Sequence, residues 1–503
     1  MDENKKRKKT SFPKHVIAAM ILAAAFIASA AVLFVFCIIL GIFPAVYLVI
    51  FAIIVLVLAY GILFANRWRA GGITANIISC LLIACFILAS FYVQVTKSTI
   101  VNVQSTDYET VYMGVYVLDE NEAEELEDLA GYEIGYDSIL EEYAAGEALS
   151  YIEEALSGDL EITDYESMYE MIDDLEAGAV EAVVLSVSYK EVAEEIEEYE
   201  WIEDGLREIE RIEVNIEKET QEEAEEDSDL GTFIIYISGI DSFGDVSVKS
   251  RSDVNILAVV NTETKNILLV TTPRDYYVTF EVTNGAYDKL THAGIYGVDQ
   301  SISAMEILYG VEVDYYIRMN FTGFENIIDA LGGITVYSDV AFSSSVSDYS
   351  YTAGYNTLDG EAALYFARER KTFTDGDFQR GRNQMAVIEA MLDEIVSFST
   401  LANYQAVMNA IADSFETNMS TSTINSIIQM QLSYGGSWDL TSYQTTGNTG
   451  YAITYSAAGQ YLSVVFQDEE SISEAMELID VCLSGGDVEA AAAAFEEDEE
   501  ETE

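Results

Sequence analysis

The chain has 503 residues, of which 50% are hydrophobic, and its formal net charge is -63 at pH 7. A chain of this length exceeds one typical domain, so we expect a membrane part and at least two soluble parts. The 87 acidic residues against 24 basic ones exclude a protein that binds nucleic acid through a basic face, which nonspecific binding to phosphates requires.

The amino-terminal part predicts a membrane anchor. Residues 1–15 contain the basic cluster NKKRKK, and residues 16–95 contain three apolar runs, each long enough at about 20 residues to cross a bilayer as a helix. The turn between the first two runs is uncharged, whereas the next turn carries Arg67 and Arg69. Because positive residues favour the cytoplasmic side, we expect residues 1–15 in the cytoplasm and every residue after 95 outside the cell. The sequence thus predicts a multi-pass protein of the cell membrane.

Residues 108–216 alternate short strands with acidic helices and predict a small extracellular α/β unit. Its strand-helix-strand order, around the segment DLEAGAVEAVVL, resembles one lobe of the periplasmic solute-binding proteins. One lobe lacks the cleft in which those proteins trap a ligand, so a spacer or a module that docks a partner is favoured over a small-molecule site. Residues 217–230 carry almost no apolar side chain and predict a solvated acidic linker.

Residues 232–486 predict an α/β domain with helices on both sides of a mixed sheet. The apolar run FIIYISGID is typical of a strand that is buried on both faces. The segment VNILAVVNTETKNILLVTT contains two β-branched runs joined by a polar stretch and predicts a hairpin. Helical segments such as ISAMEILYG and GEAALYFARER alternate with further strands. Residues 487–503, rich in alanine and glutamate, predict a disordered acidic tail.

Arginine is concentrated in this second domain. After Arg382 the sequence contains neither lysine nor arginine, although the domain is acidic throughout. Solubility does not require such a cluster, whereas a bound anion does. The guanidinium fork matches phosphate oxygens in a bidentate manner, so the cluster predicts a phosphate site. Gln384, four residues after Arg380, would share its helix face. The arginines of the cluster are Arg251, Arg274, Arg318, Arg368, Arg370, Arg380 and Arg382.

Aspartates are interleaved with these arginines. Carboxylates among phosphate-binding arginines either orient the arginines or hold a divalent cation that also touches the phosphate. A single Arg-Asp pair is more often a surface salt bridge, but several pairs at strand ends and helix starts of one domain favour a site. The aspartates are Asp241 in GIDSFGD, Asp253 in RSD, Asp275 in PRD and Asp377 in DGD.

Other chemistries are disfavoured. A Ser-His hydrolase would rest on His292 alone, the one histidine of the predicted exterior, and the sequence has no Gly-x-Ser-x-Gly motif. Zinc sites need clusters of His or Cys, and a nucleotide-driven phosphotransferase needs a Walker-type loop, neither of which occurs. A structural role is favoured for His292, although Lys289 lies close to it in the sequence.

Five segments of the second domain form a recognisable set: GID, RSDVNILAVV, TTPRD, YDKLTHAGIYG and ALYFARERKTFTDGDFQRGRNQMAVI. In this order and spacing they resemble the LytR-CpsA-Psr family of cell-envelope phosphotransferases, closely over residues 232–396 and more weakly to residue 482. The resemblance implies a LytR-CpsA-Psr-type α-β-α domain. It also implies an enzyme that transfers a glycopolymer, such as teichoic acid or capsule, from a polyprenyl pyrophosphate carrier to peptidoglycan. The phosphodiester link would form on the outer face of the membrane.

The resemblance also implies roles for particular residues. Asp241 and Asp253 would hold Mg2+ or Mn2+. Asp377 would orient the arginines and would belong, with Arg251 and Arg274, to the catalytic set. The residues that would bind the pyrophosphate are Arg251, Arg274, Arg368, Arg370, Arg380 and Gln384. Two features depart from the family, which often has one membrane helix rather than three and whose core lacks the unit at 108–216.

Two further expectations concern the backbone and the lipid. Pro273 should end the pairing of its strand, because proline lacks a backbone donor, and should hold the turn that aims Arg274 at the phosphates. The polyprenyl tail needs an apolar channel. Four apolar residues on predicted helices could line one, although core packing is the favoured role for each. These candidates are Ile307, Leu308, Phe324 and Ile328.

Two alternative functions stay open at this point. In the first, the domain hydrolyses the same lipid-linked glycan, with water in place of the sugar hydroxyl. In the second, the protein is a non-enzymatic envelope receptor, in which the small unit senses a ligand. Asp241 and Asp253 favour an enzyme over the receptor, because a pure binder does not need two metal-ligand aspartates.

Overall fold

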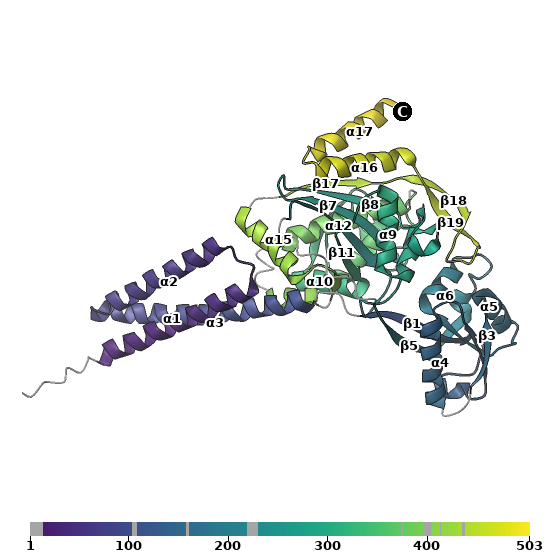
Figure 1. Ribbon diagram of the computed structural model, residues 1–503, viewed down its shortest axis with the longest axis horizontal. Coiled ribbons are helices and arrows are strands. Elements are labelled where there is room, and N and C mark those ends of the chain that lie inside the picture. Colours follow the sequence, from purple (N-terminus) through teal and green to yellow (C-terminus); the bar gives the residue numbers. More distant parts are fainter. Residues whose placement is uncertain are drawn as a thin grey trace, which may run out of the picture.

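The computed structural model of the protein describes residues 14–102, 108–156, 160–218, 230–374, 376–395, 404–412, 414–434 and 438–502. The predicted basic segment 1–15 lies almost entirely outside these described residues, as does most of the predicted linker 217–230. Figure 1 shows an arm of three long helices, a central α/β domain, and a smaller α/β unit on the side of the domain away from the arm.

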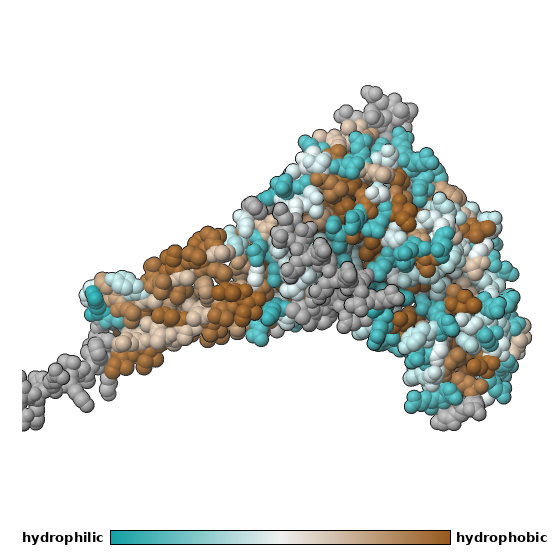
Figure 2. Space-filling view, viewed as in Figure 1, coloured by the Kyte–Doolittle hydropathy of each residue, from teal (hydrophilic) through white to brown (hydrophobic). Residues whose placement is uncertain are grey.

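Three helices form the arm: α1 (Lys14–Leu40), α2 (Ala45–Ala65) and α3 (Arg69–Asn102). The segments Ile17–Leu40, Ala45–Ala65 and Gly71–Ile100 are each long and apolar enough to cross a membrane, which confirms the three predicted runs. Figure 2 shows the arm as a largely brown, apolar surface, whereas the rest of the visible face is mixed. Such a surface suits contact with lipid, so the arm is suited to anchor the chain in a membrane.

The smaller unit is built on a five-stranded sheet with the order β3-β2-β4-β1-β5. β2 runs parallel to β3 and β4, and β1 runs antiparallel to β4 and β5. β4 is buried at every residue because helices cover both faces of the sheet. The elements are β1 (Tyr108–Leu118), β2 (Glu133–Asp137), α4 (Glu142–Leu156), β3 (Glu161–Tyr165), α5 (Met168–Glu176), β4 (Ala182–Ser186), α6 (Val187–Glu194), α7 (Ile202–Gly205) and β5 (Leu206–Glu217).

The central domain is built on a six-stranded mixed sheet with the order β16-β11-β6-β7-β8-β17. β7 and β8 form the predicted hairpin, in which Asn261 pairs with Asn266 across the turn. β6 runs parallel to β11, and β8 runs parallel to β17. The strands are β6 (Thr232–Ile240), β7 (Ser252–Asn261), β8 (Asn266–Thr272), β11 (Tyr315–Asn320), β16 (Phe415–Thr417) and β17 (Asp439–Gln444).

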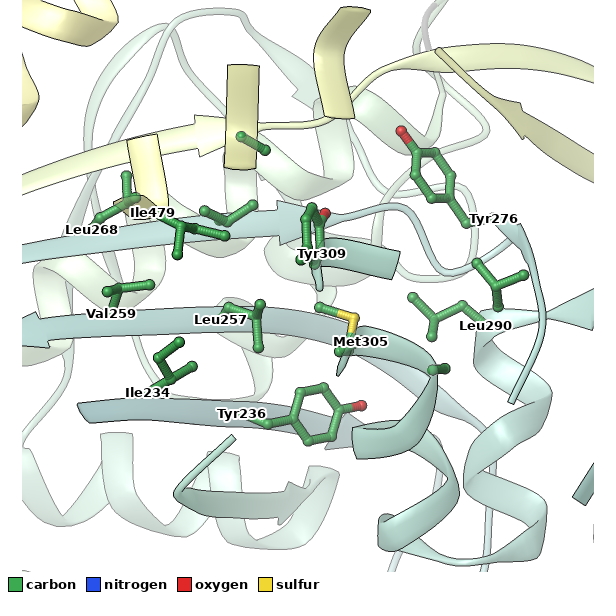
Figure 3. Close-up of a cluster of buried hydrophobic side chains, with 14 of the residues drawn as sticks. Ile234, Tyr236, Leu257, Val259, Leu268, Tyr276, Leu290, Met305, Tyr309 and Ile479 are labelled. Carbon is green, nitrogen blue, oxygen red and sulfur yellow. The ribbon is translucent and has the colours of Figure 1, made fainter. Parts of the chain in front are cut away.

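Helices cover both faces of this sheet, as predicted. On one face, Met305 of α9 (Val298–Tyr309) and Ile479 of α16 (Glu469–Leu483) pack against Leu257 and Leu268, in the core that Figure 3 shows. On the other face, Met385 of α12 packs against β7 and β8. The helices on this second side are α10 (Phe321–Leu331), α11 (Gly360–Arg368), α12 (Asp377–Ile395) and α14 (Tyr404–Ala412).

The remaining elements are short or peripheral. β12 pairs with β15 and not with the central sheet, and β18 pairs with β19 in a separate hairpin. The remaining elements are η1 (Leu126–Leu129), β9 (Tyr277–Val278), η2 (Glu281–Thr283), β10 (Asp288–Lys289), α8 (Leu290–Ala293), η3 (Gly294–Tyr296), β12 (Ile334–Ser338), β13 (Phe342–Ser343), β14 (Ser350–Tyr351), β15 (Gly354–Leu358), α15 (Thr421–Tyr434), β18 (Gly447–Ile453) and β19 (Tyr461–Gln467).

The carboxyl-terminal segment corrects a prediction. The sequence predicts a disordered tail over residues 487–503, but Val488–Thr502 form the helix α17. Val488 is buried, and Ala491, Ala492 and Phe495 pack against the core of the domain. Alanine is the best helix former and its run supplies one small apolar face, so the acidic residues between and after these positions do not prevent docking.

We expect Phe495→Ala to lower the free energy of unfolding by about 1–2 kcal/mol, because a partly buried aromatic ring then loses its contact with the core. The exposed Glu489 of the same helix provides the matched control, since Glu489→Ala removes no packed side chain. Thermal unfolding of the full chain in detergent would compare the two. Equal midpoints would contradict a packed α17.

The small unit packs directly against the central domain. The Thr110 amide donates to the Ser247 carbonyl at 3.0 Å, and the Lys249 amide donates back to the Thr110 carbonyl at 2.8 Å. One apolar core contains Tyr189 of the small unit together with Ile295 and Leu462 of the central domain. The unit is therefore not held away from the domain as a spacer would be.

The central domain also contacts the membrane helices. The Thr99 hydroxyl of α3 donates to the Met408 carbonyl of α14 at 3.1 Å. The Asn425 side chain of α15 donates to the Leu40 carbonyl, at the end of α1, at 2.9 Å. α14 and α15 therefore form the side of the domain that faces the membrane arm.

Candidate active site

A cavity of about 1200 Å³ opens at the sheet edge where β6 ends, β7 begins and β8 ends. Antiparallel pairing of β6 with β7 and of β7 with β8 brings these three positions to one edge, although they are far apart in the sequence. Asp377 is the first residue of α12, and its side chain lies outside the described part of the chain. The other predicted site residues all line the cavity: Asp241, Arg251, Asp253, Arg274, Arg368, Arg370, Arg380 and Gln384.

Arg274 lies at the end of β8. The strand ends at Thr272, directly before Pro273, as the proline predicts. The Arg274 side chain is only 8% exposed, and its Nη1 donates to Asp253 Oδ1 at 2.7 Å. Its backbone carbonyl accepts from the Thr291 amide at 2.8 Å. Both ends of the residue are therefore held, and the guanidinium is fixed in place before any substrate arrives.

Asp253 and Asp275 are kept ionised by the surrounding cations. Burial alone would raise the pKa of Asp253, but the charges of Arg274, Arg380 and Arg251 outweigh it and hold that pKa well below its usual range. Burial likewise opposes ionisation of Asp275, whereas Arg274 and Lys289 lower its pKa to about 2. At neutral pH both carboxylates are charged acceptors.

Arg251 is surrounded by three carboxylates, and two of them come from the small unit. Its guanidinium lies 2.7 Å from Asp241 Oδ2, 3.0 Å from Glu195 Oε1 and 3.2 Å from Glu191 Oε2. Glu195 also binds Lys289, with Nζ 2.5 Å from its Oε2. The small unit therefore places two acidic side chains on the cations of the candidate phosphate site, which the sequence did not predict.

The two glutamates have opposite pKa shifts. Burial raises the pKa of Glu191 to about 7, with Asp241 and Glu194 adding to the rise and Arg251 opposing it. Burial also disfavours ionisation of Glu195, but Lys289 and His292 outweigh it and lower its pKa. Glu195 is therefore the permanently charged member of the pair at neutral pH.

The remaining cations of the predicted set also line the cavity. Arg368 Nη2 lies 3.6 Å from Asp241 Oδ1, and its guanidinium stacks 4.1 Å above the Phe321 ring. Arg370 lies 3.9 Å from Asp275. Arg380 and Gln384 both project from α12 into the cavity, as their spacing predicts.

Three other residues named from the sequence lie elsewhere. Arg318 is fully buried and pairs with Glu416, while Arg382 hydrogen-bonds Gln379 on its own helix, and neither lines the cavity. His292 is 0% exposed, and its Nδ1 lies 2.7 Å from Asp288 Oδ1, outside the cavity lining. This contact gives His292 the structural role that the sequence favoured.

One end of the cavity is apolar and lies next to the membrane arm. Val407 and Ile411 of α14 line it, and Met408 of the same helix contacts α3. Of the four apolar residues proposed from the sequence, Phe324 lines the cavity, whereas Ile307 is exposed and Leu308 and Ile328 pack in cores. Further apolar lining comes from Ile327, Leu364, Val387, Ile388, Met391 and Phe415.

The cavity lining contains the two aspartates that the resemblance assigns to a divalent cation. Asp241 and Asp253 supply hard carboxylate oxygens, which suit Mg2+. The described residues contain no group of three or more His, Cys, Asp or Glu that could hold a metal. Mg2+ commonly completes its shell with water and substrate phosphates, so two aspartates are an adequate protein contribution.

The match to a known family covers this same region of the chain. A model of the LytR_cpsA_psr family matches residues 203–476, more than half of the chain. The chain belongs to the LytR-CpsA-Psr family. The match includes every cavity residue that was predicted from the sequence. It begins in the small unit, shortly before β5, so Glu191 and Glu195 lie outside it.

Several named relatives and solved structures are similar to this chain. The polyisoprenyl-teichoic acid–peptidoglycan teichoic acid transferase TagU of Enterococcus faecalis is 34% identical over 190 residues, 37% of this chain and 62% of the relative. The corresponding transferase TagT of Bacillus subtilis is 34% identical over 199 residues, 38% of this chain and 61% of the relative. The chain thus spans less than two-thirds of these relatives. The crystal structure of B. subtilis TagV has 25% identity and a TM-score of 0.42, covering 50% of this chain and 97% of that one.

Proposed function

We propose that this protein transfers a glycopolymer from a polyprenyl pyrophosphate carrier to a peptidoglycan hydroxyl, forming a phosphodiester on the outer face of the membrane. The observation that carries the proposal is one cavity with a cationic middle and an apolar end beside the membrane arm. A polyprenyl pyrophosphate has a matching arrangement, because its charged pyrophosphate group is followed by an apolar tail. The named activities of TagU and TagT support the same reaction class.

The arginines provide most of the catalysis in this proposal. As the acceptor oxygen bonds to the phosphorus that carries the glycan, the bond from that phosphorus to the bridging oxygen breaks and polyprenyl phosphate leaves. The acceptor hydroxyl loses its proton to solvent as the new bond forms. Negative charge grows on the leaving phosphate. Arg251 and Arg274 are held by carboxylates and Arg380 lines the same cavity, so all three can stabilise this charge.

Asp241 and Asp253 would hold a bound Mg2+, which would supply further charge neutralisation at the phosphates. Asp253 also orients Arg274 through the 2.7 Å hydrogen bond. The outward orientation of the domain rests on Arg67 and Arg69, which favour a cytoplasmic turn between α2 and α3.

A transfer assay with the full chain in lipid nanodiscs tests the proposal. The substrates are a polyprenyl pyrophosphate-linked disaccharide, a peptidoglycan glycan fragment and Mg2+, and products are followed by mass. We expect an acceptor heavier by one glycosyl phosphate, and loss of this product in Asp253→Ala. Free glycosyl phosphate without adduct would indicate a hydrolase, and tight lipid binding without turnover would indicate a receptor.

Replacing Glu195 with glutamine should tighten the binding of inorganic pyrophosphate by about tenfold, because a carboxylate that holds Arg251 and Lys289 loses its charge. Calorimetric titration of the full chain in detergent measures this change. Glu198→Gln is the matched control, since Glu198 is exposed and lies outside the cavity lining. Weaker binding in Glu195→Gln would show that Glu195 positions the cations for phosphate.

A further inference from the structure

The cavity has a mouth whose chemistry differs from its apolar end and its cationic middle. We define this mouth as the exposed part of the cavity lining that comes from the hairpin of β18 and β19 and from segment 197–203 of the small unit. Residues 197–202 of that segment lie outside the region that matches the LytR-CpsA-Psr family model. The residues of the mouth are Tyr451, Tyr461, Ser463, Glu197, Glu200 and Glu203.

The two tyrosines share one face of the hairpin. Tyr451 pairs with Ser463, and Ile453 pairs with Tyr461, and directly opposite residues of an antiparallel pair point to the same side. The alternate residue Leu462 is fully buried on the other side. Tyr451 is 75% exposed and Tyr461 is 64% exposed. Packing of the domain therefore does not account for two large rings that face the cavity.

This chemistry suits the sugar rings of a glycan. A tyrosine ring offers a flat apolar face to the C–H groups of a sugar and a hydroxyl for hydrogen bonding. The carboxylates of Glu197, Glu200 and Glu203 can accept hydrogen bonds from sugar hydroxyls. The same three charges repel a chain rich in phosphate. An uncharged stretch of glycan therefore fits the mouth better than a polyanion.

The geometry of phosphoryl transfer indicates whether the mouth binds the donor glycan or the acceptor glycan. The attacking and leaving oxygens lie roughly in line across the phosphorus. In the proposed reaction, the leaving polyprenyl phosphate lies toward the apolar end of the cavity, where α14 contacts α3. Figure 1 shows β18, β19 and the small unit on the side of the domain away from α3. Attack therefore comes from the side of the mouth.

We propose that the mouth is the binding site for the acceptor glycan, with Tyr451 and Tyr461 stacked on its sugar rings and Glu197, Glu200 and Glu203 bonded to its hydroxyls. This inference rests on the proposed transferase function and names the place of its second substrate. The small unit is then part of the active site, and it contributes to the choice of acceptor.

A binding experiment on the full chain in nanodiscs tests this site without requiring turnover. The probe is chitotetraose, a neutral oligosaccharide of N-acetylglucosamine. We expect Tyr451→Ala and Tyr461→Ala each to weaken its binding by about tenfold, as expected for the loss of one ring contact. Tyr451→Phe keeps the ring and should retain most of the affinity. Tyr355→Ala is the matched control, because Tyr355 is 77% exposed on the separate β12–β15 hairpin and is not part of the cavity lining.

A second arm measures binding of polyprenyl pyrophosphate with and without an attached disaccharide. The proposal expects the tyrosine variants to bind both lipids as the wild type does. A selective loss of the glycosylated lipid would assign the mouth to the donor glycan and overturn the proposal. Absence of chitotetraose binding in the wild type, or equal losses in Tyr355→Ala, would also overturn it. If chitotetraose binds as expected but no transfer occurs, the failure lies with the proposed reaction and not with the glycan site.

Discussion

Replacing Arg274 with alanine should lower the kcat/KM of glycopolymer transfer by about 10³-fold, the size of effect seen when one fixed cation or donor is removed from a developing charge. Arg274 is fixed by Asp253 at 2.7 Å and by its own backbone, and it lines the cationic middle of the cavity. No ordering step is then needed when the lipid pyrophosphate binds.

Two comparisons separate this catalytic effect from a loss of folding. Arg274→Lys keeps the charge but loses the bidentate fork, so it should recover only part of the activity. Arg211→Ala removes a half-exposed arginine of the small unit and should leave activity unchanged. Circular dichroism of each variant checks that it is folded. An Arg274→Ala variant within tenfold of wild-type activity would remove Arg274 from the catalytic set.

The largest effect on stability is expected at Arg318, which pairs with Glu416 across β11 and β16. Arg318 Nη2 lies 2.6 Å from Glu416 Oε2, and Lys218 Nζ lies 2.5 Å from Glu416 Oε1. Both members of the Arg318–Glu416 pair are nearly inaccessible to solvent. Arg318→Met should lower the free energy of unfolding by about 3–5 kcal/mol, because a buried carboxylate loses its main partner.

The matched control for this prediction is Arg211→Met. Arg211 lies 2.9 Å from Glu208, but its side chain is half exposed, so its loss should cost less than about 1 kcal/mol. Thermal unfolding of the full chain in detergent gives both values. The double variant Arg318→Met/Glu416→Leu should recover much of the loss, since it removes the uncompensated charge. Similar midpoints for Arg318→Met and Arg211→Met would contradict the account.

The Arg318–Glu416 pair also predicts a dependence of stability on pH. Burial alone would raise the pKa of Glu416, but Arg318 and Lys218 outweigh it and lower that pKa in the folded protein. The stabilisation is therefore complete above the unfolded pKa of a glutamate, about 4.3, and is lost as the pH falls through the folded value. Unfolding midpoints measured from pH 7 downward should converge for the wild type and Glu416→Gln. If the difference between the two midpoints stayed constant as the pH falls, protonation of Glu416 would not account for the loss of stability.

Much of the candidate site could be predicted because its residues stand at strand and helix ends. The β-branched runs around NTETKN specify the β7–β8 hairpin, and this pairing brings Asp241, Arg251 and Arg274 to one sheet edge. The sequence alone groups Arg318 with the other arginines, because it lies between them along the chain. Strand alternation explains the error: Ile317 and Met319 face the cavity, so Arg318 points to the other side of β11.

The contribution of the small unit could not be predicted in the same way. Glu191 and Glu195 belong to a run of glutamates in a strongly acidic chain, where such a run is ordinarily a solvated helix face. Their contacts with Arg251 and Lys289 are tertiary contacts between two folding units, and no local pattern encodes them. The docking of helix α17 is not predicted for a similar reason. Its apolar face, which includes Ala491 and Phe495, lies in a segment that is rich in glutamate.

A single-turnover reaction of the full chain in water enriched in ¹⁸O, with the lipid-linked disaccharide and a peptidoglycan fragment, separates transfer from hydrolysis. A transferase should give a glycan joined to the acceptor through a phosphodiester that contains no ¹⁸O, together with unlabelled polyprenyl phosphate, because the attacking oxygen comes from the acceptor hydroxyl. Free glycosyl phosphate that carries one ¹⁸O would show that water attacks instead, and would contradict the transferase.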